Sequence, residues 1–241
     1  MEYGLQLYSV RDITENDLAE ALRAVAALGY KFVEFAGFFG HSPEEVKQML
    51  AENGLEVSCA HVGLGELSPA CIEQTVAYHK AIGNKCLIVP AADYSTPEKL
   101  DALVDALNAA QPVLAKAGIS LGYHNHDGEY KPTAYGAWVH KELEERTGVE
   151  LEIDTYWVYA AGVDPIAELA RLGERVRVIH VKDGLSDRSG RALGEGTAPV
   201  ADVVAYAKAH GIRMVVESED LTPTGLEEVG RCMNYLKTLD A

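Results

Sequence analysis

The stretch ISLGYHNHDGEY, residues 119–130, begins as a short apolar run and ends in histidine, asparagine and carboxylate side chains. Alternation puts Leu121 and Tyr123 on one face and His124 and His126 on the other, which is the pattern of a β-strand. In proteins built from parallel strands, functional groups gather where the strands end. The stretch therefore predicts a strand whose carboxyl end belongs to a functional site.

Seven further apolar runs follow the same plan, and stretches with helical spacing separate them. The runs are YGLQLYS (3–9), KFVEFAG (31–37), LEVSCAHV (55–62), KCLIVPA (85–91), VELEIDT (149–155), VRVIHVKD (176–183) and IRMVVESE (212–219). Parallel strands that are covered on both faces have this apolar character. Eight βα units in 241 residues predict a TIM barrel, an α/β fold that forms one domain over residues 1–241.

An open doubly wound sheet is the alternative fold, but it usually has a glycine-rich loop after its first strand, where this chain has SVRDIT. The helical stretches also have recognisable ends. SPEE from Ser42 and STPEK from Ser95 each combine a capping residue with a proline in the first turn. Glycine stops are expected after five helices, at Gly29, Gly54, Gly118, Gly148 and Gly211.

Composition narrows the class of protein. The formal net charge of −16 argues against a nucleic-acid partner, which requires a basic face. No run of eighteen apolar residues predicts a membrane span, and the first residues do not resemble a secretory signal. The four cysteines are scattered and form no CxxC pair, so we expect reduced thiols in a cytoplasmic protein.

Four of the eight histidines lie at or just beyond predicted strand ends, and three carboxylates join them there. They are His61, His124, His126 and His180, with Glu34, Asp154 and Glu217. Alternation points His124 and Asp154 into the same rim from adjacent strands, and His180 and Glu217 follow on the next two strands. Two imidazoles and two carboxylates without a thiolate predict a divalent metal site, with Mn²⁺ as first choice and Co²⁺, Fe²⁺, Zn²⁺ or Mg²⁺ as alternatives.

The chain resembles the xylose-isomerase-like superfamily of TIM barrels, the sugar phosphate isomerases and epimerases, over nearly its whole length. The matching segments are GLQLYSVRD, YHNHD, ELEIDTYWVYAAGVDP, VIHVKD, LGEG and VVESE. The resemblance implies a divalent metal at the barrel mouth, held by His124, Asp154, His180 and Glu217. Many epimerases of the superfamily have a glutamate where this chain has His124, and some members have a histidine where it has Trp157. The YHNHD branch is similar to proteins that act on ketosugars and inositol-like polyols, some of them lyases.

The residues and the resemblance together suggest proton abstraction next to a metal-bound carbonyl, with an enediolate intermediate, on a ketose, sugar phosphate or keto-polyol. Glu217 is the first candidate for the base, and His126 for the second acid/base, or His124 if it is not a ligand. Lys182 is expected either to bind a substrate oxygen or phosphate or to pair with Asp183 or Glu152. Further substrate-binding candidates are Gln6, Tyr8, Glu34, His61, Asn125 and Trp157.

These early steps do not separate an isomerase or epimerase from a metal-dependent lyase or dehydratase acting on a 3-keto sugar or inosose. A barrel that binds metal and sugar without catalysis is the alternative from another class. An endonuclease, as found in the same superfamily, requires a basic face that this chain lacks. The partner we expect is a small carbohydrate, and the aromatic pair Phe38 and Phe39 leaves a homo-oligomer or a cover over the site open.

Overall fold

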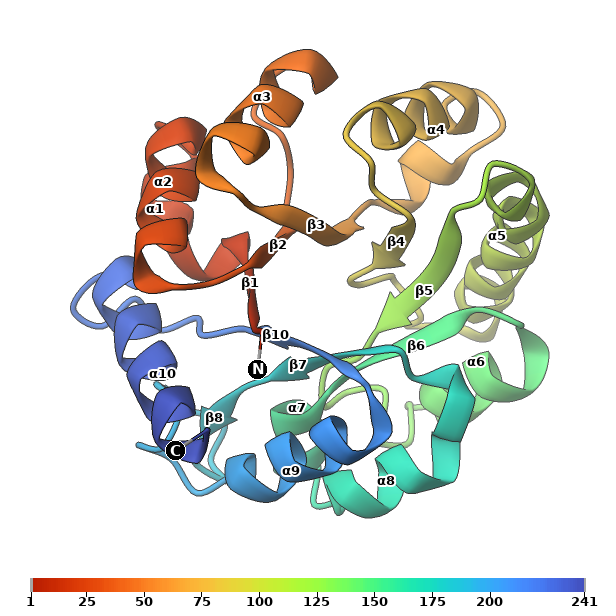
Figure 1. The fold of residues 1–241 in the computed structure, drawn as a ribbon. Helices are drawn as coiled ribbons and strands as arrows, with labels where there is room; N and C mark the ends of the chain where they lie inside the picture. The colour runs from red at the N-terminus through yellow and green to blue at the C-terminus, as the bar shows by residue number, and fades with distance from the viewer. Residues whose placement is uncertain (1, 241) are drawn as a thin grey trace.

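All eight apolar runs form parallel strands that close into a barrel, in a computed structural model that describes residues 2–240 (Figure 1). The barrel strands are β1 (Gly4–Gln6), β2 (Phe32–Phe35), β3 (Glu56–His61), β4 (Cys86–Val89), β5 (Ser120–His124), β6 (Glu150–Asp154), β7 (Val178–Val181) and β10 (Arg213–Val216). They follow one another around the barrel in chain order, and β10 closes it by pairing with β7 and β1. The predicted TIM barrel is confirmed.

Helices surround the barrel, as Figure 1 shows. They are α1 (Arg11–Thr14), α2 (Leu18–Leu28), α3 (Pro43–Asn53), α4 (Ile72–Ala81), α5 (Pro97–Lys116), α6 (Val139–Arg146), α7 (Thr155–Ala160), α8 (Pro165–Leu172), α9 (Val200–His210) and α10 (Gly225–Leu239). A short antiparallel pair, β8 (Asp183–Gly184) and β9 (Gly190–Arg191), extends from the loop after β7. Among residues 2–240, no helix is both long and apolar enough to cross a membrane.

The predicted helix starts agree with the structure. Ser42 caps α3 in a reciprocal capping box with Glu45, and Thr96 of the STPEK segment caps α5. Both helices have proline in the first turn, where its missing N–H costs no hydrogen bond. Positive φ angles at four of the five expected glycine stops fit the left-handed turn that ends a helix; these are Gly29, Gly54, Gly118 and Gly211.

The expected glycine stop at Gly148 is wrong. Helix α6 ends at Arg146, and Thr147 leaves it in an extended conformation with φ −130°. Gly148 has no left-handed φ; instead, a Cβ atom at this position would lie 3.1 Å from the side-chain oxygen of Gln111. Close packing against α5, rather than helix termination, explains the glycine.

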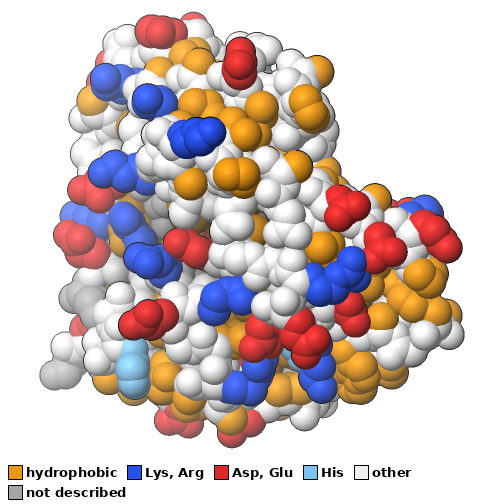
Figure 2. Space-filling view, turned by 90° about the vertical axis from the view of Figure 1, so that its right-hand side faces the viewer, with side chains coloured by type: hydrophobic (Ala, Val, Ile, Leu, Met, Phe, Trp, Pro, Cys, Tyr) orange, Lys and Arg blue, Asp and Glu red, His pale blue; other side chains and the backbone are white. Residues whose placement is uncertain are grey.

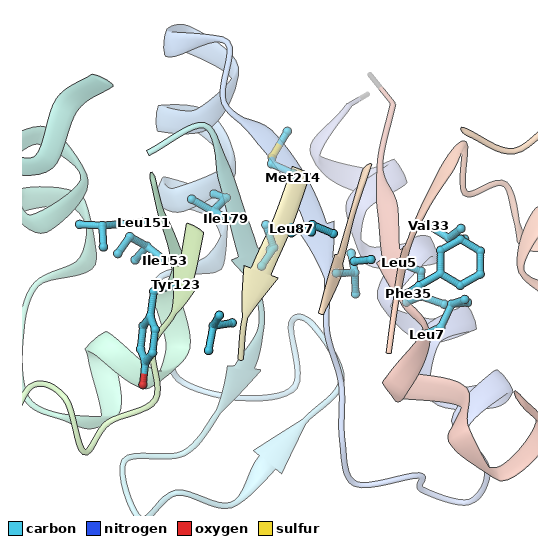
Figure 3. Close-up of a cluster of buried hydrophobic side chains, with 14 of the residues drawn as sticks. Leu5, Leu7, Val33, Phe35, Leu87, Tyr123, Leu151, Ile153, Ile179 and Met214 are labelled. Carbon is cyan, nitrogen blue, oxygen red and sulfur yellow. The ribbon is translucent and has the colours of Figure 1, made fainter. Parts of the chain in front are cut away.

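The core lies between the barrel and its helices. Leu121 and Tyr123 of β5 are each 2 % exposed and belong to this core, as strand alternation predicts. Figure 3 shows Tyr123 with Leu151, Ile153 and Ile179 beside neighbouring strands. The opposite face of β5 carries Gly122 and then His124. That alternation leaves the polar side chains inside the barrel mouth.

The aromatic pair after β2 is divided. Phe38 packs between Phe35 and Tyr78, with ring centroids 4.8 and 4.6 Å away, so it belongs to the edge of the core. Phe39 is 45 % exposed and adopts a φ of 52°.

Charges of both signs are interspersed on the face shown in Figure 2.

Candidate active site

Four side chains from adjacent strands meet inside the mouth of the barrel. His124 ends β5, Asp154 ends β6, His180 lies on β7 and Glu217 follows β10. One ligand atom from each lies within 4.8 Å of the others, and all four residues are buried. The structure therefore brings together the four residues that the sequence suggested as a ligand set.

Several polar atoms of this set have no hydrogen-bond partner. Both ring nitrogens of His124 and Oδ2 of Asp154 are buried and unpaired. The distance of 3.7 Å from His124 Nε2 to Asp154 Oδ2 is too long for a hydrogen bond. Unpaired buried polar groups cost free energy, so their convergence favours a bound ligand at this point. Imidazole nitrogens with carboxylate oxygens fit a divalent cation.

The protonation states suit the same purpose. Burial, reinforced by nearby His180, holds the pKa of His124 well below its ordinary value, which leaves a neutral imidazole that can act as a ligand. Burial raises the pKa of Asp154 to about 6, although Lys182 opposes the shift. Burial would also raise the pKa of Glu217, but Lys182 and His180 hold it well below its usual range. Glu217 is thus ionised at neutral pH.

Hydrogen bonds hold three of the four residues, Asp154, His180 and Glu217, in place. Asn125 Oδ1 accepts from the backbone N–H of Asp154 at 3.0 Å, and Asp154 Oδ1 accepts from the N–H of Trp157 at 2.9 Å to cap α7. His180 has Glu217 Oε2 3.2 Å from Nδ1 and Glu34 Oε2 2.6 Å from Nε2. A carboxylate behind a metal-binding histidine fixes the ring tautomer and orientation.

A second cluster adjoins the first and shares His180 with it. Ligand atoms of Glu34, His61, Glu152 and His180 lie within 4.8 Å of one another. His61 Nε2 is 3.0 Å from Glu152 Oε2 and 3.4 Å from Glu34 Oε1. Burial and the charge of Glu34 raise the pKa of Glu152 to about 7, whereas the two histidines overcome burial and lower that of Glu34 to about 2. The carboxylates of this cluster contact the rings of His180 and His61 and so orient them.

Lys182 is 2 % exposed, and its ammonium group lies among carboxylates. It donates to Glu217 Oε2 at 3.3 Å and to Glu219, and it lies 3.9 Å from Asp154 Oδ2. Its ammonium is also 4.6 Å from the centre of the Trp157 ring. Neither Asp183 nor Glu152, the partners considered from the sequence, pairs with it, so Lys182 faces the ligand set.

A cavity of about 510 Å³ opens above the cluster. Tyr8, His61 and His126 line it together with His124 and Glu217, so three of the expected substrate or acid/base residues face the same space as two ligands. Other candidates lie outside its lining. Gln6 and Glu34 are fully buried, and both ends of the Asn125 amide bond backbone atoms around Asp154 and His126. The half-buried Trp157 lies 5.9 Å from His126 between ring centroids.

Two carboxylates that line the cavity were missed from the sequence. Glu219 lies two positions after Glu217 and points into the same cavity, a signal that the VVESE alternation contained. Glu66 belongs to the turn Leu64–Leu67 after β3, where it accepts from the N–H of Gly63. No local pattern places such a turn at the mouth.

A closed parallel barrel with a candidate divalent-metal site at the carboxyl ends of its strands defines a metal-site TIM barrel. The model of the xylose isomerase-like TIM barrel family matches residues 22–239, and the chain belongs to that family.

Curated relatives that are similar to the chain include inosose dehydratases from two organisms. Inosose dehydratase from Geobacillus kaustophilus is 26% identical over 188 residues, which cover 68% of this chain and 61% of the relative. Inosose dehydratase from Salmonella typhimurium is 22% identical over 192 residues, covering 70% and 64%. The chain thus spans less than two thirds of the curated relatives that it matches.

Among solved structures, a sugar phosphate isomerase/epimerase from Parabacteroides distasonis matches with a TM-score of 0.84 and 27% identity, covering 98% of this chain and 97% of that one. An L-ribulose 3-epimerase matches with a TM-score of 0.74 and 14% identity, covering 99% and 94%, and shows the shared fold.

Proposed function

We propose that the protein is a divalent-metal-dependent enzyme that removes a proton from the carbon next to the carbonyl of a keto-sugar or keto-polyol. The observation that supports this most directly is the buried set His124, Asp154, His180 and Glu217, in which the His124 nitrogens and Asp154 Oδ2 have no hydrogen-bond partner. These four residues would hold the metal. When bound, the metal supplies Lewis acidity that polarises the substrate carbonyl.

The base is Glu217. It is ionised, it lines the cavity, and Lys182 Nζ lies 3.3 Å from its Oε2. The lysine holds the carboxylate in one orientation and stabilises negative charge next to it. His126 follows β5, whereas Glu217 follows β10, and both line the same cavity. His126 would donate or accept the second proton.

Return of the proton decides the product. Reprotonation at the same carbon gives an epimer, and reprotonation at the neighbouring carbon gives an isomer. An epimerase that uses two carboxylates on opposite faces does not fit His124, which stands where the second glutamate would be. We therefore propose an isomerase or epimerase that pairs Glu217 with a histidine.

A dehydratase is the second candidate. A carboxylate base with a histidine acid also fits loss of a hydroxyl from the carbon beyond the one deprotonated, and the curated relatives are named inosose dehydratases. The two candidates share the first proton transfer and differ in whether water leaves.

The test is proton exchange in deuterated buffer, using protein reconstituted with Mn²⁺ and a panel of ketohexoses and inososes. Deuterium should enter the substrate next to its carbonyl, and the product should show an isomer, an epimer or a dehydrated enone. A barrel that only binds metal and sugar would take up about one metal per chain without any exchange. The His124→Ala variant should lose the metal that the wild type binds. The control variant His140→Ala changes a helix histidine outside the cluster and should retain the metal.

A further inference from the structure

The cavity above the ligand set has a one-sided charge. Its carboxylates are Glu66, Glu217 and Glu219, and its other polar side chains are histidines and Tyr8. Within the described chain, the residues lining this cavity include no lysine or arginine. A phosphate group is ordinarily bound by arginine, lysine or clustered backbone N–H groups. The side chains that line the cavity therefore provide no lysine or arginine for a phosphate.

The cations that lie nearest to the mouth are already engaged. Lys182 pairs with Glu217 and Glu219. Arg11 donates to the backbone oxygens of Tyr8 and Glu219 and lies over the Tyr8 ring. Arg188 pairs with Asp127 on the loop after β5. A phosphate would therefore have to displace existing ion pairs.

The loop after β7 has a carboxylate where a phosphate would be expected. Phosphate sites in TIM barrels are frequently formed by the loops after the seventh and eighth strands. Here Asp183 accepts from the backbone N–H groups of Gly194, Gly196 and Ala198 at 2.9, 3.0 and 3.1 Å. A Cβ atom on Gly196 would lie 2.2 Å from Asp183 Oδ1, so the glycine loop is closed tightly around this carboxylate. The N–H donors of the loop are used by the protein itself.

The loop after β10, the eighth barrel strand, is closed in the same way. Glu228 of α10 is 1 % exposed. It accepts from the hydroxyl of Ser218 and from the backbone N–H groups of Asp220 and Thr222, the latter two at 3.3 and 2.5 Å. In both loops that could hold a phosphate, backbone N–H groups already donate to a buried carboxylate, Asp183 or Glu228.

The formal charges lead to the same conclusion. Asp154 and Glu217 would balance the two charges of a divalent ion held by the ligand set. Lys182 then balances one of the two remaining carboxylates, Glu66 and Glu219, which leaves the cavity with a net negative charge. A dianionic phosphate ester would be repelled, whereas hydroxyl groups can donate to these carboxylates and accept from the histidines.

We infer that the substrate is a neutral, unphosphorylated keto-sugar or keto-polyol, an inference that rests on the proposed function and names its substrate class. Neutral compounds should be turned over with a kcat/KM at least about tenfold above that of their phosphate monoesters, since like charge in a binding site disfavours the ester.

The experiment compares neutral ketohexoses and inososes with their phosphate monoesters by deuterium exchange on the Mn²⁺-loaded protein, and adds calorimetric titration of inorganic phosphate into the metal-free protein. Exchange confined to neutral compounds, with no phosphate binding up to about 10 mM, is the expected result. Equal or faster exchange with a monoester would overturn the inference and leave the proposed proton abstraction standing. If no compound exchanges, the proposed function fails; phosphate binding below about 1 mM would then reject the inference as well, and its absence would support a cavity closed to phosphate.

Charge variants sharpen the result. Glu66→Gln keeps an oxygen to accept from Gly63 but removes one negative charge, so the preference for neutral compounds should fall roughly two- to fivefold. The matched control is Glu73→Gln on α4, an exposed glutamate outside the cavity lining, and it should leave the preference unchanged. An equal effect of both variants would mean that overall charge, and not the cavity, sets the preference.

Discussion

Two pairs of buried carboxylates at the same end of the barrel have opposite surroundings. Asp183 and Glu228 are 2 % and 1 % exposed, and backbone N–H groups of the adjoining loops surround them. Asp154 and Glu217 are 0 % and 4 % exposed, but they face histidines and Lys182, and Asp154 Oδ2 has no hydrogen-bond partner. Burial alone therefore does not identify a functional carboxylate. The distinction lies in whether the backbone already satisfies its oxygens.

The sharpest way to break this comparison is Glu217→Gln. The amide keeps the size of the side chain but cannot accept a proton, so we expect turnover to fall by roughly 10²–10⁴-fold. The free energy of unfolding should fall as well, because the buried Lys182 and His180 each lose a charged partner. Steady-state kinetics and urea unfolding measure the two effects. Near-normal turnover would rule out Glu217 as the base.

Asp183→Asn should lower stability without removing a group of the ligand set. The amide nitrogen replaces one oxygen among four N–H donors, so at least one donor loses its acceptor. We expect the free energy of unfolding to fall by about 2–4 kcal/mol, while the folded protein should still bind metal. Unchanged urea stability would show that the loop does not depend on this carboxylate.

Glu34→Gln tests whether the carboxylate of Glu34 orients His180 for metal binding. Glu34 Oε2 lies 2.6 Å from His180 Nε2, and loss of its charge should make the histidine a weaker ligand. We expect the dissociation constant for Mn²⁺ to rise roughly 10–100-fold, as for other residues that orient a ligand. Calorimetric titration measures this constant. The control is Glu56→Gln, which changes the exposed glutamate at the start of β3. Equal metal affinity in both variants would contradict the role of Glu34.

The pH dependence of metal binding tests the same site without a substitution. Although burial opposes the shift, Glu152 and Glu217 hold the pKa of His180 well above its ordinary value, so metal binding near neutral pH must displace its proton. Below about pH 6 the raised pKa of Asp154 adds a second proton. As the pH is lowered from 8 to 6, the apparent affinity should therefore fall by about tenfold per pH unit, and below pH 6 it should fall more steeply. A titration series from pH 5 to 8 that shows one constant slope would contradict the assignment of Asp154.

The comparison also shows why some residues could be found from the sequence and others not. His124 and Asp154 end strands, so alternation alone placed their side chains inside the rim. Glu34 lies near the end of β2, but its partner His180 is 146 residues away in sequence. The complete burial of Glu34 was not foreseen. Glu66 lies on a turn whose position depends on the path of the loop after β3, which no periodicity describes.

The sequence by itself determined the strand order, the helix starts and the four ligand candidates, because side-chain alternation and local capping depend on neighbours a few residues apart. It also suggested Glu217 as a base. Only the tertiary structure decided which buried carboxylates are satisfied by the backbone and which face the cavity. That outcome depends on contacts such as those of Asp183 with Gly194 and of Lys182 with Glu217. Such contacts join elements that are distant in the chain, and barrel closure sets their distances.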